Sequence, residues 1–169
     1  MANHSAAFWI DHLQLQQHVE GGHYGEVYRS DLKLAQQALP ASFNGDRNSC
    51  THIYFLLQKG EFSAFHRIQS DELWHFYAGE PLIIYEIKTN GSLTRHILGN
   101  NPANGETLFC YIYAGSWFAS QPLPQSEYSL VGCTVSPGFD FADFELAKKD
   151  MLVKQFPDHA ELISGLCRQ

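Results

Sequence analysis

The stretch from residue 60 to residue 79, GEFSAFHRIQSDELWHFYAG, limits the possible folds more than any other part of the chain. Between its terminal glycines, polar and large apolar side chains alternate at close to period two, as in strands with one buried face. Gln69, Ser70 and Asp71 interrupt this alternation. We therefore expect a hairpin of two short strands joined at these three residues.

The alternation also sorts the side chains by face. The faces expected to point inward carry Ala64, His66 and Ile68 on the first strand and Glu72, Trp74 and Phe76 on the second. If the hairpin closes inside a barrel, His66 and Glu72 point into one cavity. Because unpaired buried polar groups are costly, the two should either satisfy each other or serve a ligand.

Charge and hydropathy exclude two classes of partner. Eleven basic residues stand against 18 acidic ones, for a net charge of −7, and no basic run is longer than Lys148-Lys149. This balance argues against binding to nucleic acid or an anionic membrane. No apolar run approaches the roughly 20 residues that span a bilayer.

The cysteines and the first residues indicate a cytoplasmic location. Cys50, Cys110, Cys133 and Cys167 are widely spaced and form no C-x-x-C pair, as in a reduced protein. The opening sequence MANHSAAFWIDHLQL lacks the basic region of a signal peptide.

The remaining elements indicate a β-rich domain. At 169 residues the chain is most simply one domain, 1–169, and 14% of its residues are aromatic. Turns recur every eight to twelve residues between strand-like segments, which favours an antiparallel sandwich or barrel. We expect these strands at about 23–29, 50–57, 81–87, 93–98, 107–113 and 128–135.

Helices and loops complete the expected order. Ser5 should cap a short N-terminal helix, and helices should cover about 143–167, the first of them over 145–156. Residues 30–48 should form a surface loop able to act as a lid, and residues 119–127 a second loop.

The spacing within residues 60–79 resembles the first cupin motif, G-x5-H-x-H-x3-E-x6-G. Gly60, His66, Glu72 and Gly79 fit it, and Ile68 stands where the second histidine is expected. The second cupin motif, P-x-G-x2-H-x3-N, has an echo in YAGSWF, residues 113–118, with phenylalanine in the place of the histidine.

Longer strings, HVEGGHYGEVYRS, SAFHRIQSDELWHFYAG and YSLVGCTVSPGFDFADFEL, resemble the cupin-5 group of proteins of unknown function. The resemblance covers about 15–146. It implies a mainly β fold, the cupin double-stranded β-helix or jelly-roll barrel, with a short N-terminal helix and C-terminal helices outside it.

The resemblance also implies a metal site of three imidazoles and one carboxylate. Ile68 and Phe118 cannot coordinate, and the two remaining ligands, His66 and Glu72, rarely hold a divalent ion tightly. We therefore expect no cofactor. The alternative is a metal-dependent enzyme with a degenerate ligand set, holding a weakly bound divalent metal at His66 and Glu72.

Without a metal, His66 and Glu72 are candidates for an acid/base pair, the carboxylate fixing the imidazole tautomer. Such a pair suits epimerisation or isomerisation next to a carbonyl group. Trp74, Phe76 and Phe118 would supply the apolar wall of the cavity. A barrel that only binds a small molecule, without catalysis, is the alternative.

The strand after Gly21-Gly22 gives a second resemblance. A glycine followed by an aromatic residue, then Glu and later Arg, is similar to the opening strand of dTDP-sugar 3,5-epimerases, metal-free cupins that bind a sugar nucleotide. It implies that Glu20, Glu26 and Arg29 lie at the mouth of the cavity, with Arg29 for the phosphates.

Two further expectations concern this strand and the quaternary structure. Simple alternation puts Glu26 on a face with Tyr24 and Tyr28, and Arg29 on the opposite face; charges facing water on an edge strand are the alternative. Arg67, His75 and Tyr77 on the outer faces are candidates for the interface of a homodimer.

Overall fold

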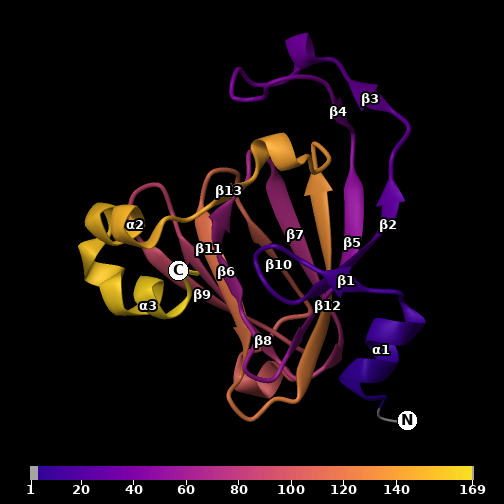
Figure 1. The fold of residues 1–169 in the computed structure, drawn as a ribbon, viewed down its shortest axis with the longest axis vertical. Coiled ribbons are helices and arrows are strands. Elements are labelled where there is room, and N and C mark those ends of the chain that lie inside the picture. Colours follow the sequence, from indigo (N-terminus) through magenta and orange to yellow (C-terminus); the bar gives the residue numbers. More distant parts are fainter. Residues whose placement is uncertain (1–3, 169) are drawn as a thin grey trace.

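The computed structural model describes residues 4–168, and its strands form two large sheets that face each other (Figure 1). The six-stranded sheet consists of β1 (Gln16–Gln17), β2 (His23–Arg29), β5 (Thr51–Gln58), β12 (Tyr128–Ser136), β7 (Asp71–Gly79) and β10 (Phe109–Ile112). The five-stranded sheet consists of β13 (Glu145–Leu146), β6 (Ser63–Arg67), β11 (Trp117–Pro122), β8 (Leu82–Ile87) and β9 (Leu93–Leu98). This mainly β, jelly-roll architecture confirms the expected fold class.

The core fills the space between the sheets. Its members come from the inward faces of both: Phe55, Leu57, Trp74, Leu82, Ile84, Leu98, Cys110, Ile112, Phe118, Val131 and Cys133. Burying each large apolar side chain contributes about 1.5–3 kcal/mol. The cavity described below opens at one end of this core.

Helices cover the outer faces. α1 (Ala6–His12) packs on the six-stranded sheet, and Ser5 accepts a hydrogen bond from the Phe8 amide, as expected for its cap. α2 (Lys149–Gln155) and α3 (Ala160–Gly165) cover the five-stranded sheet on the opposite side of the molecule (Figure 1). Short 3₁₀ turns lie at Gln36–Ala38, Pro102–Asn104, Phe141–Asp143 and Pro157–His159. Within residues 4–168 the helices all lack the length and hydropathy of a membrane span.

The first C-terminal helix begins later than expected. Residues 145–146 form β13, in which Glu145 lies opposite Arg67 and Leu146 opposite His66. The apolar spacing that suggested a helix from residue 145 therefore serves a strand first, and the helix starts at Lys149.

The expected hairpin within residues 60–79 is wrong, although both strands exist. β6 pairs with β11 and β13, whereas β7 pairs with β10 and β12, so the two belong to different sheets. The link at 68–70 carries the chain from one sheet to the other. Period-two alternation identifies a buried face, but it does not identify the partner strand.

The expected loop at 119–127 is also partly wrong. β11 runs from Trp117 to Pro122 and lies between β6 and β8 in the five-stranded sheet. Pro122 and Pro124 suggested a loop, yet Ser120 is fully buried between the neighbouring strands. Pro122 is tolerated because it is the last residue of the strand.

Residues 30–48 form an arm beyond the ends of the sheets, with a short two-stranded ladder of β3 (Lys33–Leu34) and β4 (Arg47–Asn48) (Figure 1). Arg47 anchors it through a buried ion pair with Asp143: Nε and Nη2 each lie 2.6 Å from a carboxylate oxygen. Removing one partner of such a pair costs about 3–5 kcal/mol. A lid function for the arm stays a prediction.

Gly21 makes the turn before β2 possible, and its replacement is our first test of the fold. Its φ is +118°, and a Cβ there would lie 2.1 Å from the Phe62 carbonyl oxygen. We expect Gly21→Ala to lower the free energy of unfolding by about 1–3 kcal/mol, measured by urea denaturation.

Gly165→Ala is the matched control, because a Cβ at Gly165 meets no atom within 4 Å. In a helix this exchange should be neutral or stabilising by up to about 1 kcal/mol. Equal losses in the two variants would contradict the close approach at Gly21.

Candidate functional site

A cavity of about 460 Å³ opens between the two sheets. Its size lies in the range of small-molecule sites. Its wall comes from strands β1, β2, β5, β6, β7 and β12 and from the connecting segments 18–20, 68–70 and 139–144. The residues are Gln16, His18, Glu20, Tyr24, Glu26, Arg29, Thr51, Ile53, His66, Ile68, Glu72, Cys133, Val135, Phe139, Asp140, Phe141 and Phe144. Five of the eight predicted site residues lie in this wall.

His66 is fixed by two hydrogen-bonding partners. Its Nδ1 donates to the Ala64 carbonyl oxygen at 2.7 Å, and its Nε2 lies 3.2 Å from Glu20 Oε2. Burial lowers the pKa of His66 to about 4, so the imidazole is neutral at pH 7. With Nδ1 already carrying a hydrogen, the contact with Glu20 is a hydrogen bond only if one proton lies between the two groups.

Glu20 is the carboxylate that completes this contact. Burial raises its pKa, which favours the state in which the shared proton resides on the carboxyl group. Ser63 Oγ donates to Glu20 Oε1 at 2.9 Å, and the Ala64 amide and Arg168 Nε donate to the Glu20 carbonyl oxygen at 2.9 and 3.0 Å. Backbone and side chain of Glu20 are therefore both held in place.

His18 is a site residue that the sequence reasoning missed. Its Nδ1 lies 3.5 Å from Glu20 Oε2 and accepts a hydrogen bond from the Glu20 amide at 3.4 Å. Burial lowers the pKa of His18, so this imidazole is also neutral at pH 7. The spacing His18-Val19-Glu20 before the glycine pair was the available signal.

Glu72 lies in the wall on the opposite sheet from His66 and is only 8% exposed. Burial, and then repulsion from Glu20, raise the pKa of Glu72 to about 8, while a hydrogen bond from the Cys133 thiol lowers it. The side chain is therefore mostly protonated at pH 7.

The expected pairing of His66 with Glu72 is not what the structure shows. Within residues 4–168 no hydrogen bond or ion pair joins these side chains, and His66 contacts Glu20 instead. The reason is the crossing of the chain between the sheets, which places His66 and Glu72 on facing walls.

A β-bulge explains how Glu26 and Arg29 reach the same cavity wall. Glu26 lies opposite Ile53 and Arg29 opposite Thr51, so three steps along β2 match two along β5. Because of the extra residue, the Arg29 side chain lies on the same face of β2 as the Glu26 side chain. The prediction that the two lie on opposite faces is therefore wrong.

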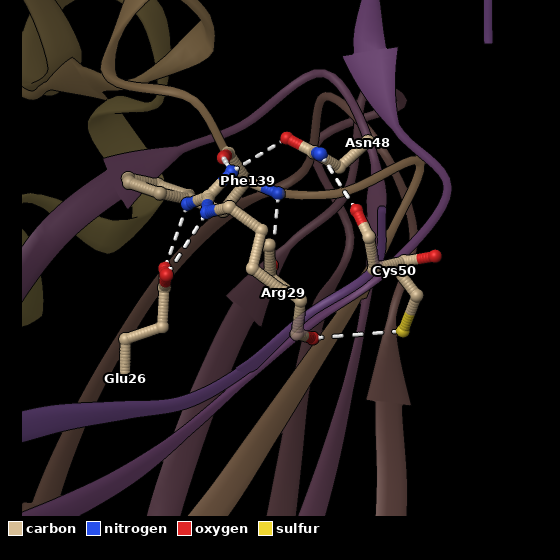
Figure 2. A network of polar contacts seen from close by, with 7 residues as sticks. Glu26, Arg29, Asn48, Cys50 and Phe139 are labelled. Atoms are coloured by element: carbon tan, nitrogen blue, oxygen red, sulfur yellow. Dashed lines mark hydrogen bonds and ion pairs between the residues drawn. The ribbon is translucent and has the colours of Figure 1, made fainter. Parts of the chain in front are cut away.

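Arg29 makes four polar contacts at the mouth of the cavity (Figure 2). Nε and Nη2 lie 2.9 and 2.6 Å from the two carboxylate oxygens of Glu26. Nη1 donates to Asn48 Oδ1 at 3.0 Å and to the Phe139 carbonyl oxygen at 3.2 Å. The guanidinium thus joins β2, the arm and the segment 139–144.

Trp74, Phe76 and Phe118 lie in the core cluster rather than in the cavity wall. Trp74 and Phe118 are each 1% exposed, and the Phe118 ring packs on His66 with centroids 4.1 Å apart. Trp74 and Phe118 face inward, as expected, but other core side chains enclose them, and Phe76 packs partly buried against the same cluster. The aromatic residues of the wall are Tyr24, Phe139, Phe141 and Phe144, which the sequence reasoning did not single out.

The residues present do not fit the metal that the cupin resemblance implies. Ile68 and Phe118 offer no donor atom, and no group of three or more His, Cys, Asp or Glu side chains in the described part of the chain is arranged to hold a metal ion.

The raised pKa of Glu72 predicts how stability depends on pH. Between pH 6.5 and 8 the folded protein keeps the Glu72 proton, whereas the unfolded chain, with an ordinary pKa near 4.5, has lost it. Stability should therefore fall as pH rises through this window, by up to about 1.4 kcal/mol for each pH unit. The lowered pKa of His66 affects stability below pH 6.5. There the unfolded chain binds the imidazole proton and the folded protein does not, so this contribution makes stability rise with pH.

Glu72→Gln, which cannot ionise, should remove this slope while leaving the protein folded. The measurement is urea denaturation at pH 6.5, 7.25 and 8, with Glu145→Gln on the outer surface as control. An unchanged slope in Glu72→Gln would contradict the assignment to Glu72.

Comparisons with known proteins place the chain in a family. Residues 7–147 match the model of the Cupin superfamily (DUF985). A hypothetical protein from Leishmania major shares 34% identity at a TM-score of 0.90, over 98% of this chain and 100% of that chain. A protein from Shewanella oneidensis shares 43% identity at a TM-score of 0.86, over 99% of both chains.

Similarity in fold reaches further. Oxalate decarboxylase from Bacillus subtilis has a TM-score of 0.53 at 15% identity, over 89% of this chain and 36% of the enzyme. At that identity the likeness concerns the fold alone. Comparison with curated proteins gives no match. The two-sheet barrel, the glycine-bounded motif with His66 and Glu72, and the match over residues 7–147 together show that this chain belongs to the Cupin superfamily, in the DUF985 group.

Proposed function

We propose that this cupin is a metal-independent enzyme that moves a proton next to the carbonyl group of a sugar-like compound, as an epimerase or isomerase does. One observation carries the proposal. Three buried titratable side chains line one cavity. On one side Glu20 and His66 can share a single proton, and on the other side Glu72 is mostly protonated at pH 7.

The Glu20–His66 pair is suited to act as the base. The form that acts as the base is the one in which the pair has released its shared proton to water. The Glu20 carboxylate and the His66 Nε2 lone pair then lie 3.2 Å apart and repel each other. Accepting a proton from the carbon next to the substrate carbonyl restores the hydrogen bond between them. The electron pair of the broken C–H bond then forms an enol or enolate.

Glu72 is suited to act as the acid. Its protonated carboxyl group lies in the opposite wall and can donate a hydrogen bond to the carbonyl oxygen, where negative charge develops. Return of a proton to the same carbon from Glu72, on the other face, gives an epimer, after which the pair releases its proton to water and Glu72 takes one up. Return of the proton from the Glu20–His66 pair to the neighbouring carbon gives an isomer. Both outcomes conserve atoms and need no oxidant.

The decisive experiment follows exchange of substrate protons for deuterium. Free sugars, sugar phosphates and small keto acids are incubated with the protein in deuterated water, and proton NMR records loss of the signal next to the carbonyl. We expect His66→Ala and Glu20→Gln each to slow exchange by roughly 10²–10⁴-fold, because a general base contributes that much. Binding, measured by thermal shift, should be largely retained.

His12→Ala is the matched control, since His12 is an exposed histidine outside the cavity. Exchange should also persist in EDTA if the reaction is metal-independent. Binding without exchange in the wild type would favour the alternative, a barrel that only binds its ligand. Loss of exchange in EDTA would favour the metal-dependent alternative.

We also propose that the protein pairs with a second copy of itself through the outer face of the six-stranded sheet. The part that α1 leaves uncovered, here termed the aromatic face, consists of His52, Tyr54, His75, Tyr77, Phe109 and Tyr111. Its rings contact one another, and Thr134 Oγ1 lies 2.7 Å from His52 Nδ1 and 3.2 Å from His75 Nε2. These positions carry no carboxylate, so two copies of a protein of charge −7 can approach here.

Light scattering at micromolar concentration should give the mass of a dimer, and Tyr77→Glu should reduce it to that of a monomer. Tyr77 is 46% exposed, and two carboxylates meeting across a two-fold axis repel each other. Met151→Glu on α2, at a position that is 67% exposed, is the control and should stay dimeric. A monomeric wild type would end this proposal.

A further inference from the structure

We infer that the cavity takes an uncharged polyhydroxy carbonyl compound, a free sugar, and that Glu26 excludes phosphorylated sugars by occupying Arg29. This inference rests on the proposed function, because it names the substrate class of the same site. It replaces the expectation that Arg29 binds the phosphates of a sugar nucleotide.

The guanidinium of Arg29 has little capacity left for a ligand. Of its five N–H donors, two point at the Glu26 carboxylate and two serve Asn48 and the Phe139 carbonyl oxygen. A bidentate phosphate contact needs two free donors. The adjacent Glu26 carboxylate also cancels the positive charge that would attract a phosphate.

The other ionisable groups of the wall make it still less suited to an anion. Glu20, Glu72 and Asp140 are carboxyl groups, and the His18 and His66 imidazoles are neutral at pH 7. The protonated Glu72 carboxyl group and the Glu20–His66 pair both donate and accept hydrogen bonds, as hydroxyl groups do, and none of them carries the positive charge that would attract a phosphate. A ligand rich in hydroxyl groups therefore matches the wall, and a phosphate does not.

Glu72 adds an independent indication that a hydrogen-bonding ligand binds here. The side chain is more than nine-tenths buried and faces the cavity. Among residues 4–168 no N–H or O–H group donates to its carboxyl oxygens; its one partner is the Cys133 thiol, a weak donor. Because Glu72 faces the cavity, hydroxyl groups of a ligand can supply the stronger hydrogen-bond partners that a carboxyl group normally has.

The aromatic part of the wall suits the apolar faces of a sugar ring. Phe139, Phe141 and Phe144 contact one another with ring centroids 5.1–6.3 Å apart, and Tyr24 packs edge-on against His18 at 4.7 Å. Flat apolar walls with a few polar groups orient a small polar ligand without requiring it to be charged.

The test is a gain of binding. Isothermal titration calorimetry with inorganic phosphate, at low salt, compares the wild type with Glu26→Gln, which loses the carboxylate that occupies Arg29. We expect no measurable phosphate binding by the wild type and at least tenfold tighter binding by Glu26→Gln. Glu145→Gln is the matched control: it releases Arg67 from a similar surface pair, with contacts of 2.6 and 2.7 Å, outside the cavity.

Phosphate binding by the wild type, or equal binding by the two glutamine variants, would overturn the role of Glu26.

A second titration compares glucose, mannose and fructose each with its 6-phosphate, and glucose with glucosamine. The inference is upheld if at least one free hexose binds and each that binds does so at least tenfold more tightly than its phosphate. Three outcomes overturn the inference. They are tighter binding of a sugar phosphate than of its free sugar, tenfold tighter binding of glucosamine than of glucose, and no binding of any free hexose at 10 mM.

Deuterium exchange separates this inference from the proposed function. Exchange of a sugar phosphate but not of its free sugar would retain the proton-transfer function and end the assignment of an uncharged substrate. Tight binding of a free sugar without exchange would retain the assignment of an uncharged ligand and end the proton-transfer function.

Discussion

The buried carboxyl group of Glu20 connects the parts of the molecule that meet at the cavity. Its side chain contacts His66 and Ser63 on β6 and His18 before β2, and its carbonyl oxygen accepts hydrogen bonds from the Ala64 amide and from Arg168 near the C-terminus. An ionised carboxylate in this position would be costly, so a proton shared with His66 stabilises the fold. Gly21, which follows directly, permits the close backbone approach that brings Glu20 there.

Much of the fold could be predicted because it follows from local patterns. Period-two alternation identified β6 and β7 and their inward faces, and Asn90-Gly91 correctly indicated the β8–β9 hairpin. The same alternation could not show that β6 and β7 belong to different sheets, because strand pairing is decided by contacts that are distant in sequence. β11 was missed for a related reason. Its polar Ser120 is buried because β11 lies between β6 and β8, and the local sequence carries no signal of that position.

The site was predictable only in part. His66, Glu72, Glu20, Glu26 and Arg29 all reach the cavity, but their pairings differ from those expected. The bulge in β2 shifts Arg29 by one face, and a single extra residue of this kind leaves no clear sequence signal. Likewise the aromatic wall comes from residues 139–144, which follow the last long strand and fold back over the cavity.

Ile68 and Phe118 set this cavity apart from the metal site that the cupin motifs describe. At these two positions the cupin motifs place histidines, and their replacement removes two donors for a metal. The replacements also make the surroundings of His66 more apolar, because the Phe118 ring packs directly on the imidazole and Ile68 lines the cavity beside it. Burial is the leading cause of the lowered pKa of His66 and the raised pKa of Glu72. The two apolar side chains that stand in the place of metal ligands therefore favour the neutral imidazole and the protonated carboxyl group on which the proposed proton transfer depends.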